Sequence, residues 1–188
     1  MNGLLIKLLV RGREEPRFVD LFAGIIDALD AHWWGHPSVL GGAFPAPIEL
    51  SDTDTLIFPL GNAAYVFWRP GVFKRFAPYF PGDEFFSINA LPLAEDAEAY
   101  LAKRLRKHGD PDDPDAIGAA IILGYVDSNL WEIYAEDRAL LVRLETSLNN
   151  RSDVQCFRGH RNERERLYQR AGFPPEWIAP RRSRSGES

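Results

Sequence analysis

Near the start of the chain, a continuous run of apolar residues is followed by apolar residues at helical spacing. Residues 4–10, "LLIKLLV", form a short apolar run typical of a buried strand. Residues 17–32 place apolar side chains three and four positions apart, as a helix with one buried face requires: Phe18, Leu21, Phe22, Ile25, Ile26 and Leu29. This part of the sequence therefore predicts a strand followed by one helix.

The middle of the chain is dominated by short strand patterns. Residues 33–47 contain Gly and Pro at turn positions and predict an irregular loop. "IEL" (48–50) and residues 84–93 read as strands, and residues 55–68 predict a hairpin that turns at Gly61-Asn62. Between them, "GVFKRFAPYF" is expected to form one or two helical turns.

The second half predicts two further helices around a second hairpin. Residues 94–109 carry acids in the first turns and basic residues in the last, which suits the helix dipole. Residues 117–135 predict a hairpin, and a helix is expected from Asp137, with leucines on one face. The order of elements predicts an α+β fold, a mainly antiparallel sheet with about three packed helices.

Composition changes after Asn149, where arginine rises and apolar residues become sparse. We therefore expect a single α+β domain over 1–150, an Arg-rich segment over 151–178 that packs on this domain, and a disordered tail over 179–188.

The net charge differs between these parts. Residues 1–150 carry a net charge of −9 and residues 151–188 a net charge of +4. An acidic body does not suit phosphate contacts, so nucleic acid is not an expected partner of the body, whereas a basic protein partner is. Arginines interleaved with Tyr168, Phe173 and Trp177 keep a nucleic-acid accessory role of the C-terminal segment open as an alternative.

Other features bear on the compartment. No apolar run approaches the roughly 20 residues that span a bilayer, and no secretory signal pattern is found, so no membrane partner is expected. Cys156 is the only cysteine, which excludes an intramolecular disulfide and a multi-cysteine zinc site. These features favour a cytoplasmic location.

Catalytic motifs are absent from the sequence. It contains no GxGxxG, no GxxxxGK[ST] and no GxSxG pattern. His32 and His36 have the spacing of metal ligands on a helix, but Gly35 and Pro37 end the helix that this spacing requires. Neither a metal nor a cofactor is predicted. The enzymatic alternative is a hydrolase that uses His32 or His36 with a carboxylate.

The stretch "AHWWGHP" (31–37) supplies the main candidates for partner binding. Trp33 and Trp34 are adjacent in an irregular segment, so they cannot easily both point inward, and one is expected to be at least partly exposed. Asp52 and Asp54 are expected on the rim of the same contact surface. Glu132 alternates with Trp131 and Ile133 along a strand and is expected to point outward.

Residues 124–145, "GYVDSNLWEIYAEDRALLVRLE", resemble a strand-cap-helix pattern of small bacterial immunity proteins, which neutralise toxins. The resemblance implies a non-enzymatic inhibitor that occludes the active site of a partner toxin. The sequence thus favours a protein-binding module, with Trp33, Trp34, Asp52, Asp54 and Glu132 contacting a basic toxin domain.

Overall fold

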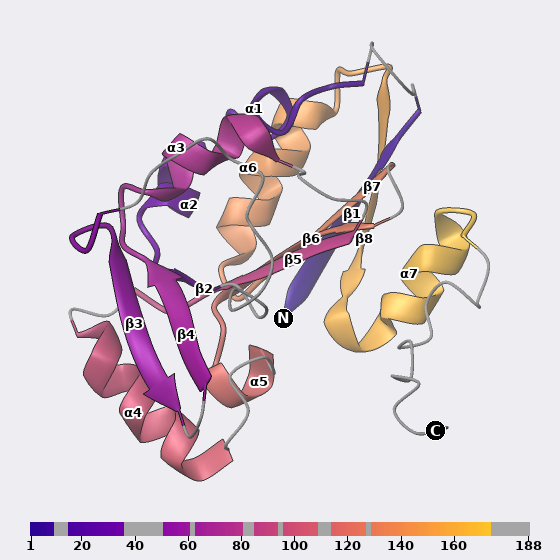
Figure 1. Ribbon diagram of the computed structural model, residues 1–188. Helices are drawn as coiled ribbons and strands as arrows, with labels where there is room; N and C mark the ends of the chain where they lie inside the picture. The colour runs from indigo at the N-terminus through magenta and orange to yellow at the C-terminus, as the bar shows by residue number, and fades with distance from the viewer. Residues whose placement is uncertain are drawn as a thin grey trace, which may run out of the picture.

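Eight antiparallel strands form one sheet in the computed structural model, which describes residues 1–9, 15–35, 51–60, 63–80, 85–93, 96–108, 114–126 and 129–173. The strand order is β3-β4-β2-β5-β6-β7-β1-β8 (Figure 1). In chain order the strands are β1 (Asn2–Leu8), β2 (Trp34–Gly35), β3 (Thr55–Leu60), β4 (Ala63–Trp68), β5 (Phe85–Ala90), β6 (Ile121–Val126), β7 (Leu130–Ala135) and β8 (Val154–His160).

The described part of the chain also contains seven α-helices and two 3-10 turns. Four of the helices have only four or five residues. The helices are α1 (Phe18–Leu21), α2 (Ile26–Asp30), α3 (Phe73–Phe76), α4 (Ala97–His108), α5 (Pro114–Ile117), α6 (Arg138–Leu148) and α7 (Arg164–Arg170). The 3-10 turns are η2 (Ala77–Tyr79) and η3 (Arg161–Glu163). None of these helices has the length and apolar character needed to cross a bilayer.

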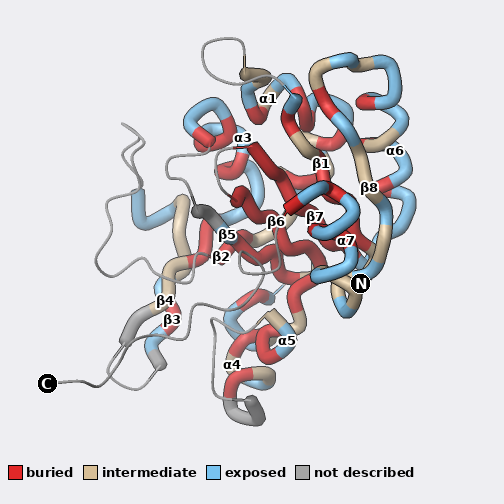
Figure 2. Tube along the Cα trace, turned by 90° about the vertical axis from the view of Figure 1, so that its right-hand side faces the viewer, coloured by how far each residue is buried: buried red, intermediate tan, exposed pale blue. Residues whose placement is uncertain are grey.

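Helices cover both faces of the sheet. One core cluster joins α1, α2, α3 and α6 to one face, and a second joins α4, α5 and α7 to the other. All residues of β6 and β7 are buried as a result, and these strands lie in the interior of the molecule (Figure 2). A strand covered on both sides gains from apolar residues at every position, which explains the continuous run "IILGYV".

The α+β class and the antiparallel sheet are confirmed, but the expectation of about three helices is wrong. The predicted single helix over 17–32 is divided into α1 and α2 by a turn at 22–25. Five of its six patterned apolar residues are nevertheless buried, and Ile26 is partly buried against the same core. The turn keeps these side chains on the core without a continuous helix.

Both predicted hairpins are present, as β3–β4 and β6–β7. Helix α4 lies within the predicted range 94–109, and α6 begins directly after Asp137. The Asp137 side chain accepts a hydrogen bond from the Ala139 N–H at 2.8 Å, the geometry of an N-cap. The predicted strand at 48–50 and the tail over 179–188 lie outside the described residues.

The C-terminal segment contributes a strand that the sequence analysis did not predict. β8 pairs with β1 over seven residue pairs, from Asn2↔His160 to Leu8↔Val154. Helix α7 then packs on the sheet through Leu167 and Tyr168. Residues 154–173 are therefore part of the same sheet and core as the preceding domain, rather than a separate layer on it.

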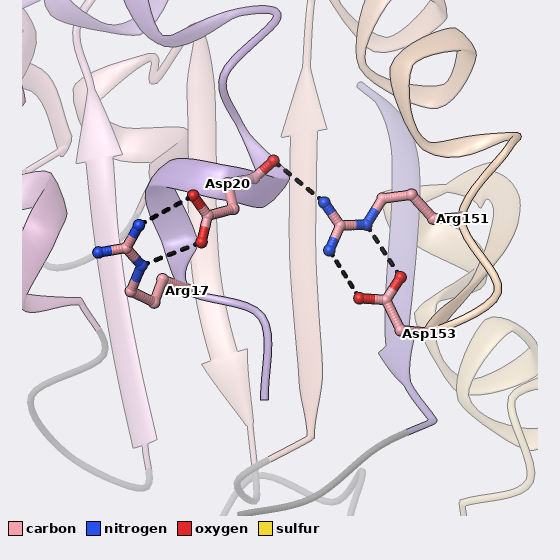
Figure 3. A network of polar contacts seen from close by, with 4 residues as sticks. All are labelled: Arg17, Asp20, Arg151 and Asp153. Atoms are coloured by element: carbon pink, nitrogen blue, oxygen red, sulfur yellow. Dashed lines mark hydrogen bonds and ion pairs between the residues drawn. The ribbon is translucent and has the colours of Figure 1, made fainter. Parts of the chain in front are cut away.

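A polar network ties the start of α1 to the connection between α6 and β8 (Figure 3). Arg17 donates to both carboxylate oxygens of Asp20, and Arg151 donates to both of Asp153. Arg151 also reaches the Asp20 carbonyl oxygen at 3.5 Å. Each arginine holds the pKa of its aspartate partner below the usual range. Because the groups are partly solvated, their role is to position these segments more than to stabilise them.

We expect a chain that ends at Asn150 to lose cooperative unfolding. It lacks β8 and α7, so β1 gains a free edge and Leu5 and Tyr134 lose their apolar cover. Thermal unfolding followed by circular dichroism checks this. A chain ending at Phe173, which keeps every described element, is the matched control. Equal midpoints for the two chains would contradict the expectation.

Candidate functional site

The two adjacent tryptophans lie in different environments. Trp34 is 1% exposed, stacks on Phe73 with ring centroids 4.6 Å apart, and donates its indole N–H to the Leu29 carbonyl at 2.7 Å. This bond satisfies a carbonyl at the end of α2. Trp33 is only partly buried, and the guanidinium of Arg69 lies 5.1 Å from its ring centroid. Trp33 is therefore the tryptophan that reaches the surface.

His32 belongs to the scaffold around Trp33. Its ring Nδ1 donates to the Leu91 carbonyl at 2.7 Å, and its backbone N–H donates to the Leu29 carbonyl at 3.2 Å. The His32 side chain thus fixes the chain before β2 to the residue after β5. The side chain that hydrogen bonds the end of α2 is the indole of Trp34. Within the described residues, no carboxylate lies within hydrogen-bonding distance of His32. His36 lies outside those residues.

Asp52 and Asp54 occupy the turn that precedes β3. Asp52 is exposed. Asp54 accepts hydrogen bonds from the Ser51 N–H at 3.0 Å and the Ser51 hydroxyl at 2.9 Å, and lies 2.9 Å from Arg75 Nη1. The Ser51 N–H and the Arg75 guanidinium lower the pKa of Asp54 to about 2. Asp54 therefore carries a full negative charge at neutral pH.

The ends of four neighbouring strands, β2, β3, β4 and β5, bring Trp33 and Asp54 to the same end of the sheet. The Arg69 N–H donates to the Asp54 carbonyl at 2.8 Å, while the Arg69 guanidinium covers the Trp33 ring. The Leu91 N–H donates to the Trp33 carbonyl at 2.9 Å, and Leu93, two residues further on, is 70% exposed. We call this set the Trp33 surface: Trp33, Asp52, Asp54, Arg69 and Leu93.

Glu132 does not belong to this surface. As expected, it lies on the opposite side of β7 from Trp131, but that side is covered by α7 and Glu132 is only 6% exposed. The expectation that it points outward to a partner is therefore wrong. The alternation along β7 predicts correctly which face of the sheet Glu132 lies on. It does not predict that α7 covers this face. Of the five residues expected to contact a partner, Trp34 and Glu132 are in the interior.

The Glu132 carboxylate accepts four hydrogen bonds. Arg164 donates from Nε to Oε2 and from Nη2 to Oε1, both at 2.9 Å, and the hydroxyls of Tyr134 and Tyr168 each donate to Oε2 at 3.1 Å. Gly124 on β6 leaves room for the Glu132 side chain, because a Cβ at position 124 would lie 2.9 Å from Glu132 Cγ. We call Glu132, Tyr134, Arg164 and Tyr168 the Glu132 network.

Burial and the adjacent carboxylate raise the pKa of both Tyr134 and Tyr168, so their hydroxyls remain protonated donors. Burial, the largest single influence, lowers the pKa of Arg164, but Glu132, Tyr168 and Tyr134 together outweigh it and raise this pKa. Every oxygen of the carboxylate is occupied, so Glu132 serves as an internal tie between β7 and α7. It is not placed as a general base.

Cys156 and His160 do not form a nucleophile and base pair. They are four residues apart on β8, which separates them by about 13 Å along an extended strand. Burial and the negative charge of Glu145 raise the pKa of the Cys156 thiol to about 11. The described residues also contain no group of three His, Cys, Asp or Glu side chains that could hold a metal ion.

Arginines of the C-terminal segment pair with acids of the preceding domain. Arg158 pairs with Glu145 on α6, Arg161 with Asp115 on α5, and Arg164 with Glu132 on β7. The basic charge of this segment is thus partly neutralised within the fold.

A cavity of about 330 Å³ lies between α6 and the paired strands β1 and β8. Arg138, Arg158 and His160 line it. Sequence reasoning missed this site, because Arg138 is twenty residues or more from the other two and only the packing of α6 brings them together. The local sequence indicates only that Arg158 and His160, two positions apart, would lie on the same side of a strand.

No family model, no curated protein and no solved structure matches this chain.

We expect Arg164→Ala to lower the free energy of unfolding by about 3 kcal/mol, because it leaves the buried Glu132 carboxylate uncompensated. This is the lower end of the range for buried pairs, since the Arg164 side chain is 41% exposed. Urea unfolding measures the change.

The matched control for this prediction is Arg166→Ala, two residues further along α7, whose side chain is 81% exposed. It should change stability by less than about 0.5 kcal/mol. In a Glu132→Gln background, Arg164→Ala should cost less than in the native chain, because no buried charge is left unpaired. An equal loss of unfolding free energy in both backgrounds would show that Arg164 does not stabilise the fold through the Glu132 charge.

We expect alkylation of Cys156 by iodoacetamide at pH 8 to be about a hundredfold slower than that of an unperturbed thiol. With the pKa raised to about 11, thiolate is scarce at pH 8, and the rate should rise about tenfold per pH unit up to that value. The denatured chain is the control and should react at the ordinary rate. A plateau near pH 9 in the folded protein would contradict this.

Proposed function

We propose that this chain is a non-enzymatic protein-binding module of the immunity type, which occludes the active site of a partner toxin through the Trp33 surface. The observation that carries the proposal is a partly exposed tryptophan beside Arg69, with the exposed Leu93 and the acidic turn of Asp52 and Asp54 at the same end of the sheet. Aromatic side chains are the most frequent energetic anchors of protein interfaces, and a charged rim guides association.

Preorganisation supports this role for Trp33. Its carbonyl is held by the Leu91 N–H, the neighbouring His32 ring is held by the Leu91 carbonyl, and Arg69 covers its ring. A side chain fixed in this way loses little conformational entropy when a partner binds. Arg69 also supplies a planar cation beside the ring, a second residue type enriched among interface anchors.

Electrostatics supports a basic partner. Residues 1–150 carry a net charge of −9, whereas the ionised carboxylate of Asp54 is paired with Arg75. Asp52, two residues away, is exposed. Such charges accelerate encounter with a positively charged face more than they increase final affinity.

The segment that resembles immunity proteins has a structural role in this chain. Residues 124–145 form the end of β6, then β7 and most of α6, and Trp131 and Tyr134 within them are buried. The likeness therefore concerns the scaffold, and the proposed contact surface comes from other segments. A toxin-blocking function rests on the Trp33 surface and on this resemblance together.

We expect Trp33→Ala and Leu93→Ala to weaken binding to the partner by about 2 kcal/mol, roughly thirtyfold, if these side chains are anchors. The partner is to be isolated with the native chain from its host and tested for toxin activity that this chain inhibits stoichiometrically. Titration calorimetry then compares the variants. Leu9→Ala is the matched control, because Leu9 is 51% exposed and follows β1 at the opposite end of the sheet.

Asp52→Lys should mainly lower the association rate, and the difference from the native chain should shrink as salt is added. Thermal unfolding of each variant verifies that the fold is retained. The proposal is wrong if the captured partner keeps its activity when the native chain is bound, or if the Leu9 and Leu93 variants bind equally well.

A further inference from the structure

The cavity beside α6 has the size of a small-molecule site. Its volume of about 330 Å³ lies at the lower end of the range of about 300–1,000 Å³ that is usual for ligand pockets. Three elements form it: α6, the start of β1 and the end of β8. Its lining residues are Asn2, Gly3, Leu4, Arg138, Leu141, Val142, Arg158, Gly159 and His160.

The lining combines apolar walls with basic side chains. Leu4, Leu141 and Val142 contribute aliphatic surface, while Arg138 and Arg158 contribute guanidinium groups. His160 adds a ring that can donate a hydrogen bond. None of the lining residues is acidic, and the Glu145 carboxylate pairs with one of the two guanidiniums, that of Arg158.

Local structure explains how these groups converge. Arg158 and His160 are two positions apart on β8, so they face the same side of the sheet. They pair in register with Leu4 and Asn2 of β1. On α6, Arg138, Leu141 and Val142 are three and four positions apart and share one side of the helix.

Arg138 is at an unfavourable place for helix stability. It is the first residue of α6, where the helix dipole disfavours a cation, and the carboxylate directly before it, that of Asp137, is engaged as the N-cap. Within the described ranges, no carboxylate lies at ion-pair distance from Arg138. Arg158 is paired with Glu145, so its guanidinium is shared. A bound anion would compensate Arg138.

The adjoining pocket has a different character. It shares His160 with the cavity, but Asp115 and Glu163 also line it. Arg161, which also lines this pocket, is already paired with Asp115, and the Glu163 carboxylate disfavours a further negative charge there. An anion is therefore expected on the Arg138 side of His160.

We propose that this cavity binds a small organic carboxylate with an apolar body. The carboxylate would be held by the guanidiniums of Arg138 and Arg158, since this planar group matches a carboxylate in shape and donors. The apolar body would contact Leu4, Leu141 and Val142. This site is independent of the Trp33 surface, because β5, β6 and β7 separate β2 from β1 in the sheet.

The test uses the full chain with three probes of related size or charge: benzoate, benzyl alcohol and inorganic phosphate. Titration calorimetry measures affinity, and amide chemical shifts of Gly3 and Gly159 report on the cavity. We expect benzoate to bind with a dissociation constant below about 1 mM. Benzyl alcohol lacks the charge and phosphate lacks the apolar body, so each should bind at least about tenfold more weakly.

Variants locate the binding. Arg138→Ala should weaken benzoate at least about tenfold without loss of folding, because Arg138 is exposed and alanine favours a helix. Val142→Glu adds a negative charge to the lining and should abolish benzoate binding. Arg166→Ala, on the exposed side of α7, is the matched control and should leave the affinity unchanged.

Several results would overturn the proposal. Absence of saturable benzoate binding would do so, and so would equal affinity for benzyl alcohol or for phosphate. Equal effects of Arg138→Ala and Arg166→Ala would show a nonspecific response to charge. Because none of these measurements uses the protein partner, the outcome is separate from that of the proposed inhibitory function.

Discussion

Burial of the Glu132 carboxylate is the constraint on which the C-terminal half of the fold depends. A carboxylate that is 6% exposed is stable only if its oxygens are hydrogen bonded and its charge is compensated. Arg164 and Tyr168 of α7 and Tyr134 of β7 meet this need. The last helix is therefore required by a residue in the central sheet, and β8, which leads to that helix, closes the sheet against β1.

The same arrangement determines which charges remain for a partner. Arg158, Arg161 and Arg164 pair with acids of the preceding domain, so much of the basic character of the C-terminal segment is used inside the fold. Arg138 and Asp52 are exposed, at separate places along one end of the sheet. The first lines the cavity that we propose binds an organic anion, and the second belongs to the Trp33 surface that we propose contacts a basic protein.

Much of the fold could be predicted from local patterns. Both hairpins, the long helices α4 and α6 and the cap at Asp137 follow from period and turn chemistry, which act within a few residues. β8 could not be predicted, because "VQCFRGH" at a sheet edge is only partly buried and shows no clean alternation. Its extended form depends on pairing with β1, about 150 residues earlier. The candidate site was predicted in part, through Trp33, Asp52 and Asp54, but without Arg69 or the cavity.

The sequence by itself determined the direction of neighbouring side chains. Alternation along a strand places Trp131 and Glu132 on opposite faces of the sheet, and two adjacent tryptophans in an irregular segment cannot easily both point inward. Only the tertiary structure decided what each face meets. Trp34 entered the core because Phe73 and the Leu29 carbonyl receive it, and Glu132 was covered because α7 packs there. Local geometry fixes orientation, whereas burial depends on elements distant in the chain.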